Sequence, residues 1–296
     1  MGAANMNMNM NMNMNMNMGG AALGLPSVAP AQVRFNTADY RKLAKNPPQW
    51  PALAVTPAPK FPKDWDPDLR SYVYLNEFVS RTAWPADLVA LQAVAAGVGL
   101  PDATAATLDA ELKAVLNSAP DRDDRFAEII HQHDAEGAIS YFLGMLMIDP
   151  ARHPKTYLLI RVARRIGELV TMTLKNEPDP VGHSLYRVPR PSQYCPAIVP
   201  MIDPPVTPSF PAGHALEATL IALALKDAWA SLPPGQQPRS DMLDYLAFRI
   251  GENRIIAGLH FPRDIAAGNA VAVACYPKMV LGAQFAQLVL DARGES

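Results

Sequence analysis

The stretch from Arg254 to Asp264 reads RIIAGLHFPRD and combines a helix start with ionisable side chains. Pro262 favours the first turn of a helix, where a missing N–H costs little, and Asp264 then lies in the same turn. A carboxylate there can reach back, as in a capping box, to accept a hydrogen bond from one nitrogen of His260. That bond would fix the imidazole tautomer and leave the other nitrogen as a nucleophile. Arg254 lies six residues before His260, across a turn expected at Ala257-Gly258, and it offers a planar fork that suits two oxygens of a tetrahedral oxyanion.

A second stretch, from Pro208 to His214, reads PSFPAGH and ends where an apolar helical pattern begins. Gly213 and His214 are therefore expected at a helix N-terminus, where free N–H groups and the positive end of the helix dipole attract an anion. Gly213 lets the backbone approach a ligand closely, and a histidine here can donate a proton to a leaving oxygen. A solvated histidine near a helix start gives the same pattern, so this stretch alone is a weak signal.

A third stretch, from Arg187 to Gln193, reads RVPRPSQ and sets two arginines among prolines. Prolines hold the backbone extended and rigid, and a stiff mount suits arginines that clamp an oxyanion. The same residues also fit an ordinary charged surface loop. Taken together, the three stretches predict one oxyanion site, with Arg187 and Arg190 among its positive charges.

Helical patterns dominate the rest of the chain, and strand patterns are scarce. Apolar residues recur at helical spacing, and proline or acidic residues mark several helix starts. The sequence therefore predicts an all-α bundle with one long, proline-rich functional loop from Asn176 to Pro211. The expected helices start at Asp66 and Trp84, cover Ala103–Leu116, Asp123–Ile148 (with a break at Gly137) and Pro154–Lys175, and follow His214 and Pro262.

The N-terminal residues differ in composition from the rest of the chain. Asn and Met alternate from Asn5 to Met18, which indicates a disordered low-complexity tail over residues 1–35. Prolines crowd residues 36–68 and favour an extended arm, which could wrap a second copy in a homo-oligomer. The helical catalytic domain is then expected over residues 69–296.

Composition excludes several classes of function. Lys and Arg number 26 against 28 Asp and Glu, so neither nucleic acid nor an anionic membrane surface is an expected partner. No uninterrupted apolar stretch reaches the roughly 20 residues that cross a bilayer, and the first residues lack the pattern of a signal peptide. The sequence thus predicts a soluble, cytoplasmic protein. Cys195 and Cys275 are too few and too far apart for a disulfide scaffold or a zinc site.

The run His131-Gln-His133-Asp134 looks at first like a metal site. Residues two apart on a helix do not share a face, and no further ligand lies nearby in the sequence. Metal binding at this run is therefore not expected.

In this order, the three stretches resemble the superfamily of vanadium haloperoxidases and type 2 phosphatidic acid phosphatases, which includes soluble bacterial acid phosphatases. The family pattern is K-x6-R-P, then P-S-G-H, then S-R-x5-H-x3-D. The resemblance covers residues 183–264 and implies a helical bundle of that type. Its counterparts in this chain are Arg190-Pro191, Pro211-Ala212-Gly213-His214 and Arg254…His260…Asp264.

The resemblance also implies a role for each matched residue. His260 would attack phosphorus and form a phosphohistidine, or would coordinate vanadium if vanadate is bound. Asp264 would orient His260, and His214 would be the general acid toward the leaving group. The oxyanion would be held by Arg190, Arg254 and the backbone N–H of Gly213.

The chain departs from the family pattern at three positions. His183 stands where the family has lysine, and Arg187 or Lys175 are the other sources of that charge. Ala212 replaces the serine of the second motif, and Asn253 replaces the serine of the third. Losing a charged and a neutral donor would cost roughly a few kcal/mol of oxyanion binding.

Three functions stay open on these residues. The first is hydrolysis of a small phosphomonoester, which needs no cofactor. The second is a vanadate-dependent haloperoxidase that oxidises halide with hydrogen peroxide; Thr207 occupies a position where some haloperoxidases carry histidine or an aromatic residue. The third is a catalytically weakened relative that binds an anion. Loss of the lysine should harm vanadate retention most, so the sequence favours the phosphatase.

Overall fold

The computed structural model describes residues 65–81, 83–176, 187–230 and 240–295. The expected tail over residues 1–35, the arm up to residue 64 and the candidate residue His183 lie outside these ranges. Within them every regular element is helical and no strand occurs, as the sequence predicted. The α-helices, in chain order, are α4 (Pro67–Arg81), α5 (Trp84–Val98), α6 (Ala105–Asn117), α7 (Arg122–His131), α8 (Ala135–Met145), α9 (Pro154–Asn176), α10 (Pro191–Tyr194), α11 (Gly213–Trp229), α12 (Ser240–Ile256), α13 (Pro262–Val280) and α14 (Ala283–Arg293); the 3₁₀ turn η2 (Ala119–Asp121) precedes α7.

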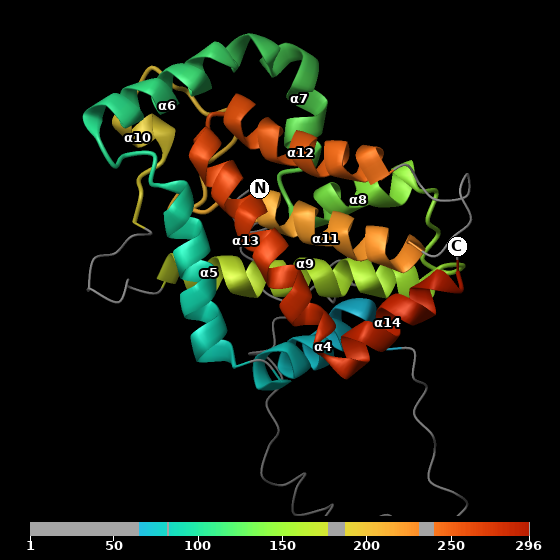
Figure 1. Cartoon of the computed structure of the whole chain (residues 1–296). Helices are drawn as coiled ribbons and strands as arrows, with labels where there is room; N and C mark the ends of the chain where they lie inside the picture. The colour runs from blue at the N-terminus through green and yellow to red at the C-terminus, as the bar shows by residue number, and fades with distance from the viewer. Residues whose placement is uncertain (1–64, 82, 177–186, 231–239, 296) are drawn as a thin grey trace, which may run out of the picture. The chain divides into compact units, whose positions relative to one another are not determined.

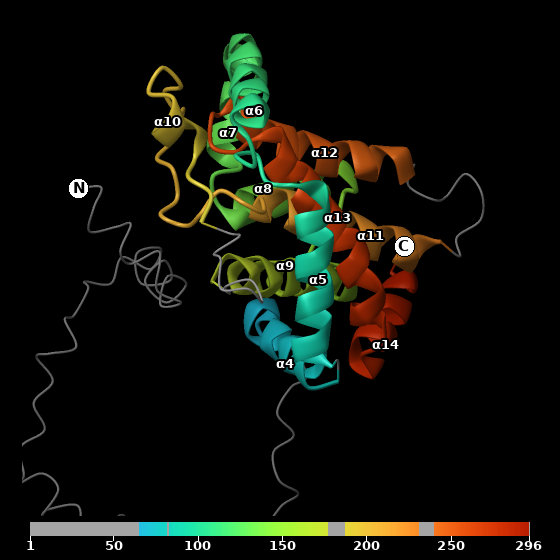
Figure 2. The same ribbon diagram turned by 60° about the vertical axis from the view of Figure 1, so that its left-hand side comes forward.

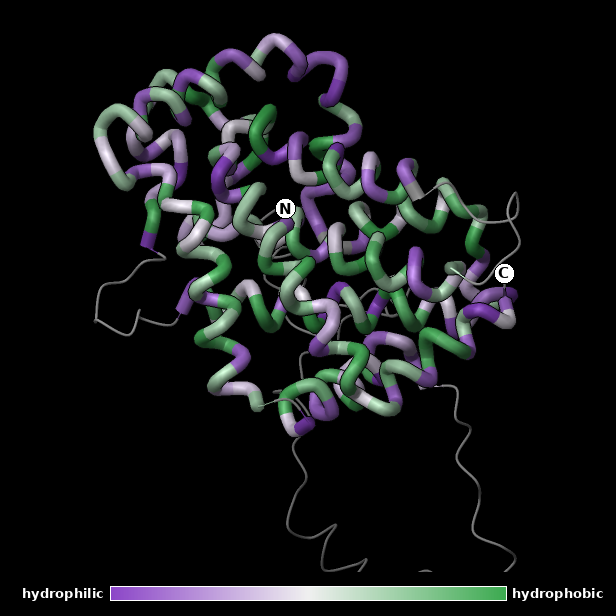
Figure 3. Tube along the Cα trace, in the orientation of Figure 1, coloured by the Kyte–Doolittle hydropathy of each residue, from purple (hydrophilic) through white to green (hydrophobic). Residues whose placement is uncertain are grey.

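Helix α11 is the centre of the bundle. It packs against α9, α12 and α13, and Figures 1 and 2 show it between α9 and α12 with α13 crossing it. Its sequence is apolar on nearly every side, as the hydropathy colouring of Figure 3 shows, and a helix of that kind is stable only when surrounded by others. Five alanines on its buried faces allow neighbouring backbones to approach closely: Ala215, Ala218, Ala222, Ala224 and Ala228.

Helix α9 supports α11 with one buried stripe. Apolar residues recur along it at helical spacing, and residues such as Leu159, Val162, Ile166 and Val170 are almost fully buried. The same stripe ends in two polar residues, Thr171 and Lys175, which are also buried. The end of α9 therefore brings polar groups into the core beside the N-terminus of α11.

The corner between α12 and α13 forms as the sequence predicted. Pro262 is the first residue of α13, and the N–H of Leu259 bonds to the carbonyl of Arg254 at 3.0 Å. Gly258 has a φ of 76°, a left-handed conformation that glycine adopts without a steric penalty. The turn expected after Arg254 is therefore present, and it ends α12 just before His260.

Some predicted helix boundaries were wrong. The expected helix over Asp123–Ile148 is two helices, and the break lies at Gln132–Asp134 rather than at Gly137. Asp134 caps α8 by accepting a hydrogen bond from the N–H of Gly137 at 2.7 Å, so this glycine begins a helix instead of interrupting one. A Cβ at Gly137 would lie 1.6 Å from the carbonyl oxygen of His131, which explains the glycine by the close approach of α7.

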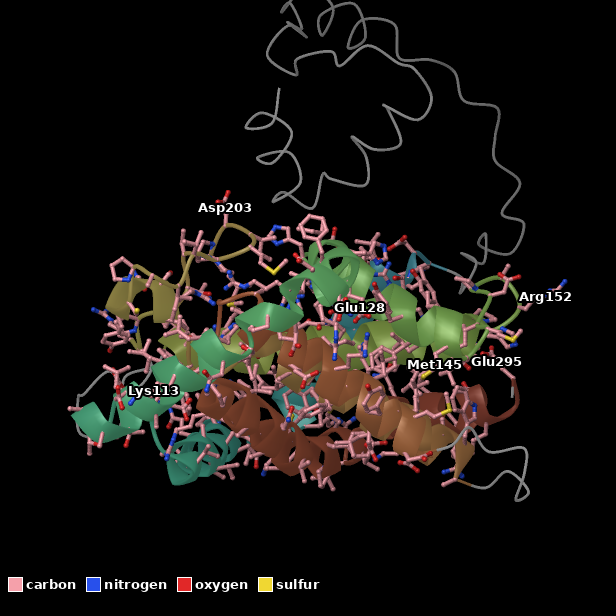
Figure 4. All side chains as sticks on the ribbon, turned by 90° about the horizontal axis from the view of Figure 1, so that it is seen from above. Lys113, Glu128, Met145, Arg152, Asp203 and Glu295 are labelled. Atoms are coloured by element: carbon pink, nitrogen blue, oxygen red, sulfur yellow. The ribbon has the colours of Figure 1, made fainter. Side chains whose placement is uncertain are left out.

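Three helices were not predicted at all: the short α10 inside the expected loop, α12 upstream of Arg254 and α14 at the C-terminal end. In α12 charged residues alternate with apolar ones, and Tyr245 and Phe248 are exposed, so no clean apolar stripe marks the helix. Glu128 of α7, labelled in Figure 4, accepts hydrogen bonds from Arg249 and Asn253 of α12. Polar contacts between helices thus hold α12 where hydrophobic periodicity is weak.

Candidate active site

The three predicted stretches meet at the N-terminal ends of α11 and α13. Arg190 precedes α10, Gly213 begins α11, and Arg254 lies in the last turn of α12. His260 lies in the short link before α13, and Asp264 lies in the first turn of that helix. Two main-chain hydrogen bonds join the stretches, from the N–H of residue 212 to the carbonyl of residue 264 at 3.0 Å and from the N–H of residue 209 to the carbonyl of residue 188 at 2.9 Å.

His260 is hydrogen-bonded on both ring nitrogens. Its Nδ1 lies 3.1 Å from Oδ2 of Asp264, and that oxygen also accepts the N–H of Phe261 at 2.9 Å. The carboxylate therefore makes both the cap contact and the imidazole contact that the spacing predicted. Ser209, fully buried, donates its hydroxyl to the same oxygen. The Nδ1–H bond to a carboxylate leaves Nε2 of His260 with a free electron pair.

Arg190 contacts Nε2 of His260, the ring nitrogen that carries no proton. Its Nη1 lies 3.2 Å from Nε2 of His260 and donates to the carbonyl of Leu259 at 3.0 Å. The rest of its guanidinium donates to the carbonyls of Pro205 and Thr207 at 3.0 to 3.2 Å, and to the hydroxyl of Thr207 at 3.3 Å. The group is thus held rigidly, with one edge against the histidine nitrogen that carries the electron pair.

Gln193 fixes the backbone that carries Arg190. Its side-chain oxygen accepts the N–H of Arg190 at 2.7 Å, while its own N–H bonds to the carbonyl of Arg190 at 2.9 Å. Together with Pro191 at the first position of α10, this reciprocal pair limits the motion of the loop. The rigid mount expected from the prolines is therefore built from proline and glutamine together.

His214 and Arg254 share one acceptor, the carbonyl of Gln132 at the C-terminal end of α7. Nε2 of His214 lies 3.0 Å from that oxygen, and Nη1 of Arg254 lies 3.3 Å from it. Arg254 also donates to the carbonyl of Ile129 at 3.2 Å. A carbonyl only accepts, so Nε2 of His214 carries its proton. The Nε of Arg254 is buried and has no hydrogen-bond partner among the described residues.

Gln132 is itself held in place. Its side-chain oxygen accepts a hydrogen bond from Nδ2 of Asn253 at 2.8 Å, and the side chain is fully buried. Asn253 is one of the positions that depart from the family pattern, and here it joins α12 to α7. Asn253 therefore holds Gln132, whose carbonyl bonds to His214, although this asparagine replaces the serine of the family pattern.

Gly213 and Ala212 lie at the start of α11. No side chain caps this helix, so its first N–H groups face the site without a side-chain partner. A Cβ at Gly213 would lie 3.2 Å from the methyl group of Thr171. Glycine fits this position because α11 packs closely on α9 here. Ala212 is fully buried and offers no hydroxyl, so the donor missing from the sequence is missing here too.

Lys175 and Arg187 differ sharply as substitutes for the family lysine. Arg187 is exposed and lines a surface pocket of about 470 Å³ that Arg190 and Thr207 also line. Lys175 is buried, and its Nζ donates to the carbonyl of Pro208 at 2.6 Å. Its charge acts on His260 and on Asp264. The structure therefore brings Lys175 to the site from α9, while Arg187 stays on the surface.

Burial shifts the ionisation of every group in the site. Burial lowers the pKa of His260 well below its usual range, and the nearby charge of Arg190 lowers it further. Burial raises the pKa of Asp264 to about 6, against the hydrogen bond from Ser209, which lowers it. At neutral pH His260 is therefore neutral and Asp264 is ionised, which suits a histidine nucleophile.

The positive groups are shifted as well. Burial lowers the pKa of Arg190 and of Arg254 to about 10, so both stay charged at neutral pH. Burial, together with the charge of Arg190, lowers the pKa of Lys175 to about 7. Burial and the charge of Arg254 lower the pKa of His214 well below its usual range. The site therefore gathers positive charge that a bound anion would neutralise.

Sequence reasoning missed four polar residues around this cluster: Ser209, Gln132, Thr171 and Glu217. Ser209 lies inside the stretch quoted for His214, but nothing in its spacing pointed to Asp264. Gln132 lies in the run that resembled a metal site. In that run His131 packs edge-on against the ring of Tyr141, and no group of three or more metal-ligating side chains occurs in the part of the chain that the structure describes.

The chain matches no known family model, and a search of curated proteins found no match either. Among the described helices, none is by itself both long enough and apolar enough to cross a membrane. Only α13 and α14 together would reach that length, and they are bent by 96° relative to each other.

Proposed function

We propose that the chain is a phosphomonoester hydrolase that works through a phosphohistidine on His260, and that its helical bundle belongs to the vanadium haloperoxidase and type 2 phosphatidic acid phosphatase superfamily. One observation carries this proposal. The ring of His260 lies buried between Oδ2 of Asp264 and Nη1 of Arg190, at 3.1 and 3.2 Å. Asp264 orients the ring, while Arg190 marks the place where negative oxygens would sit beside the attacking nitrogen.

The reaction follows from these positions. The electron pair on Nε2 of His260 attacks phosphorus, the bond from phosphorus to the ester oxygen breaks, and that oxygen takes a proton from His214. Water then attacks the phosphohistidine, the P–N bond breaks, and His214 receives a proton from the water. Phosphate and an alcohol leave, and both histidines return to their starting state. Asp264 stabilises the positive charge on His260 at each stage.

His214 must gain a second proton before it can act as the acid. In the structure its single proton lies on Nε2 and is donated to the carbonyl of Gln132. A phosphate dianion beside His214 favours the doubly protonated ring, because opposite charges raise the pKa of a histidine. The proposed activity is therefore strongest under acidic conditions.

Four groups are suited to hold the oxyanion. Arg190 brings a fixed positive charge. The N–H donors come from Arg254, whose Nε has no partner among the described residues, and from Gly213 at the uncapped start of α11. Lys175 adds a positive charge from α9, in place of the lysine that the motif lacks. These donors lie in a buried environment, where charge stabilisation is stronger than in water.

The haloperoxidase alternative uses the same nitrogen, Nε2 of His260, as the ligand of vanadate. The position where some haloperoxidases place a halide-directing side chain is Thr207. In this chain the carbonyl and the hydroxyl of Thr207 both accept hydrogen bonds from Arg190. Thr207 therefore holds Arg190 in place and is not free to direct a halide. This contact favours the phosphatase of the two candidates.

The test compares the two activities in one preparation of the full chain. Release of p-nitrophenol from p-nitrophenyl phosphate, blocked by vanadate and absent in His260→Ala, is the expected result. Bromination that requires vanadate and hydrogen peroxide, with no phosphate release, would instead establish the haloperoxidase. If neither activity occurs, and phosphate does not bind, the proposal of an oxyanion enzyme is wrong.

A further inference from the structure

A row of polar side chains runs along the contact between α9 and α11 and includes residues outside the three motifs. On α9, Arg164, Thr171 and Lys175 recur at spacings of seven and four residues and so share one face. On α11, Glu217 faces this row, and its Oε2 lies 3.5 Å from Nε of Arg164. The row connects the buried Lys175 of the candidate site with a carboxyl group one turn into α11.

The second oxygen of Glu217 lies beside the start of α11. Its Oε1 is 3.7 Å from the point that a Cβ on Gly213 would occupy. The hydroxyl oxygen of Thr171 is 3.8 Å from the same point; it is fully buried and has no hydrogen-bond partner among the described residues. An acceptor and an unused hydroxyl therefore flank the helix N-terminus that is suited to the oxyanion.

A carboxylate beside an anion site has a definite chemical consequence. An oxyanion without a proton meets repulsion from Glu217, whereas one that carries an O–H group donates a hydrogen bond to it. Phosphate near neutral pH retains at least one P–OH group, while sulfate retains none. A site that contains such an acceptor rejects the ligand that leaves it unpaired.

Resting on the function proposed above, we propose that Glu217 makes the site selective for protonated oxyanions of the phosphate type over sulfate, while Thr171 supplies a hydroxyl donor that Ala212 lacks. Neither residue belongs to the three motifs. Both come from the contact between α9 and α11, and both lie beside Gly213.

The protonation of Glu217 sets the direction of a pH effect. Burial raises its pKa to about 7, and the charged groups that act on it are Arg164, Arg165, Glu168 and Lys175 of α9. Below that pH the protonated carboxyl of Glu217 donates a hydrogen bond to sulfate, so sulfate can bind. Above that pH the carboxylate repels sulfate. Loss of the Lys175 charge weakens the binding of both phosphate and sulfate. The ratio of the two affinities therefore reports on Glu217.

The experiment measures binding of inorganic phosphate and of sulfate to the full chain by titration calorimetry. Near pH 8 the wild-type protein should bind phosphate at least about tenfold more tightly than sulfate. This ratio should shrink near pH 6. In Glu217→Gln the ratio near pH 8, where both ligands are dianions, should fall to about twofold or less. Glu168→Gln removes the same charge from α9 away from Gly213, and it should keep the wild-type ratio.

The outcomes separate the two proposals. If the wild-type protein binds both anions equally, or Glu217→Gln keeps the wild-type ratio, this inference is wrong while the phosphatase proposal stands. If the wild-type protein binds neither anion, both fail. Should Glu217→Gln not fold, Glu217→Asp decides in its place, because it keeps the carboxylate but draws it away from Gly213 and should lower the ratio near pH 8; an unchanged ratio would overturn the inference.

Discussion

The two histidines of the site differ in how their partners are arranged. His260 has a carboxylate on Nδ1 and a guanidinium on Nε2, and the contacts of Ser209 and Leu259 complete that half. His214 instead gives its proton to a backbone carbonyl of α7, which Arg254 also contacts. The proposed nucleophile is thus held by side chains, whereas the proposed acid is bound to the protein's own main chain. This difference teaches that a ligand must replace the carbonyl of Gln132 before His214 can act.

The largest effect is expected at the proposed nucleophile. His260→Ala removes the nucleophile, and kcat/KM for p-nitrophenyl phosphate should fall at least about 10⁴-fold, because no other group can form the covalent intermediate. His153→Ala, outside the site, is the matched control and should keep its activity. Thermal unfolding of both variants shows whether each is folded. Substantial residual activity in a folded His260→Ala protein would contradict the assignment of the nucleophile.

Arg190→Lys tests whether the guanidinium is needed for more than its charge. A lysine cannot contact Nε2 of His260 and the carbonyls of residues 205 and 207 together, so kcat should fall about 10² to 10³-fold. Arg249→Lys makes the same change on α12, where the arginine pairs with Glu128, and should leave kcat close to wild type. A loss below about fivefold in Arg190→Lys would show that charge alone suffices.

His214→Gln tests the proposed acid. An alkyl phosphate needs a proton on its leaving oxygen, so its hydrolysis should fall about 10²-fold, while p-nitrophenyl phosphate loses less because p-nitrophenolate leaves readily. Burial and the charge of Arg254 lower the pKa of His214, so the wild-type rate should fall as the pH rises and the ring loses its second proton; this alkaline limb should be absent in His214→Gln. Equal losses for both substrates would assign His214 to binding instead.

Ser209→Ala should have the smallest effect of the four. It removes one hydrogen bond to Asp264 and leaves the other contacts of that carboxylate, so kcat near neutral pH should fall about tenfold. That hydrogen bond lowers the pKa of Asp264, so its loss raises the pKa above about 6. The acidic limb of the pH profile should therefore move to higher pH. Ser140→Ala, on α8, should leave the profile unchanged.

The sequence predicted the contacts that are local in the chain. Four residues separate His260 from Asp264, and proline at 262 fixes the helix start, so their hydrogen bond follows from local geometry alone. The turn at Gly258 and the position of Gly213 at a helix start were predictable for the same reason. The all-helical architecture followed from the periodicity of the apolar residues in most of the chain.

Contacts between distant elements were not predictable in the same way. Lys175 reaches the site because the buried stripe of α9 ends beside α11, which depends on how two helices pack. Gln132 acts through its carbonyl, and any residue type carries that group, so the sequence offers no signal for it. The hydroxyl of Ser209 meets Asp264 across 55 residues of chain. Spacing rules describe one element at a time, and these contacts belong to pairs of elements.

The most direct test of the account is to trap the proposed intermediate. Full-length protein is mixed briefly with a ³²P-labelled phosphomonoester, denatured in alkali and digested, and the labelled peptide is sequenced. The expected result is an alkali-stable, acid-labile label on His260 that is absent in His260→Ala. A label on another residue, or hydrolysis by His260→Ala at the wild-type rate, would contradict it.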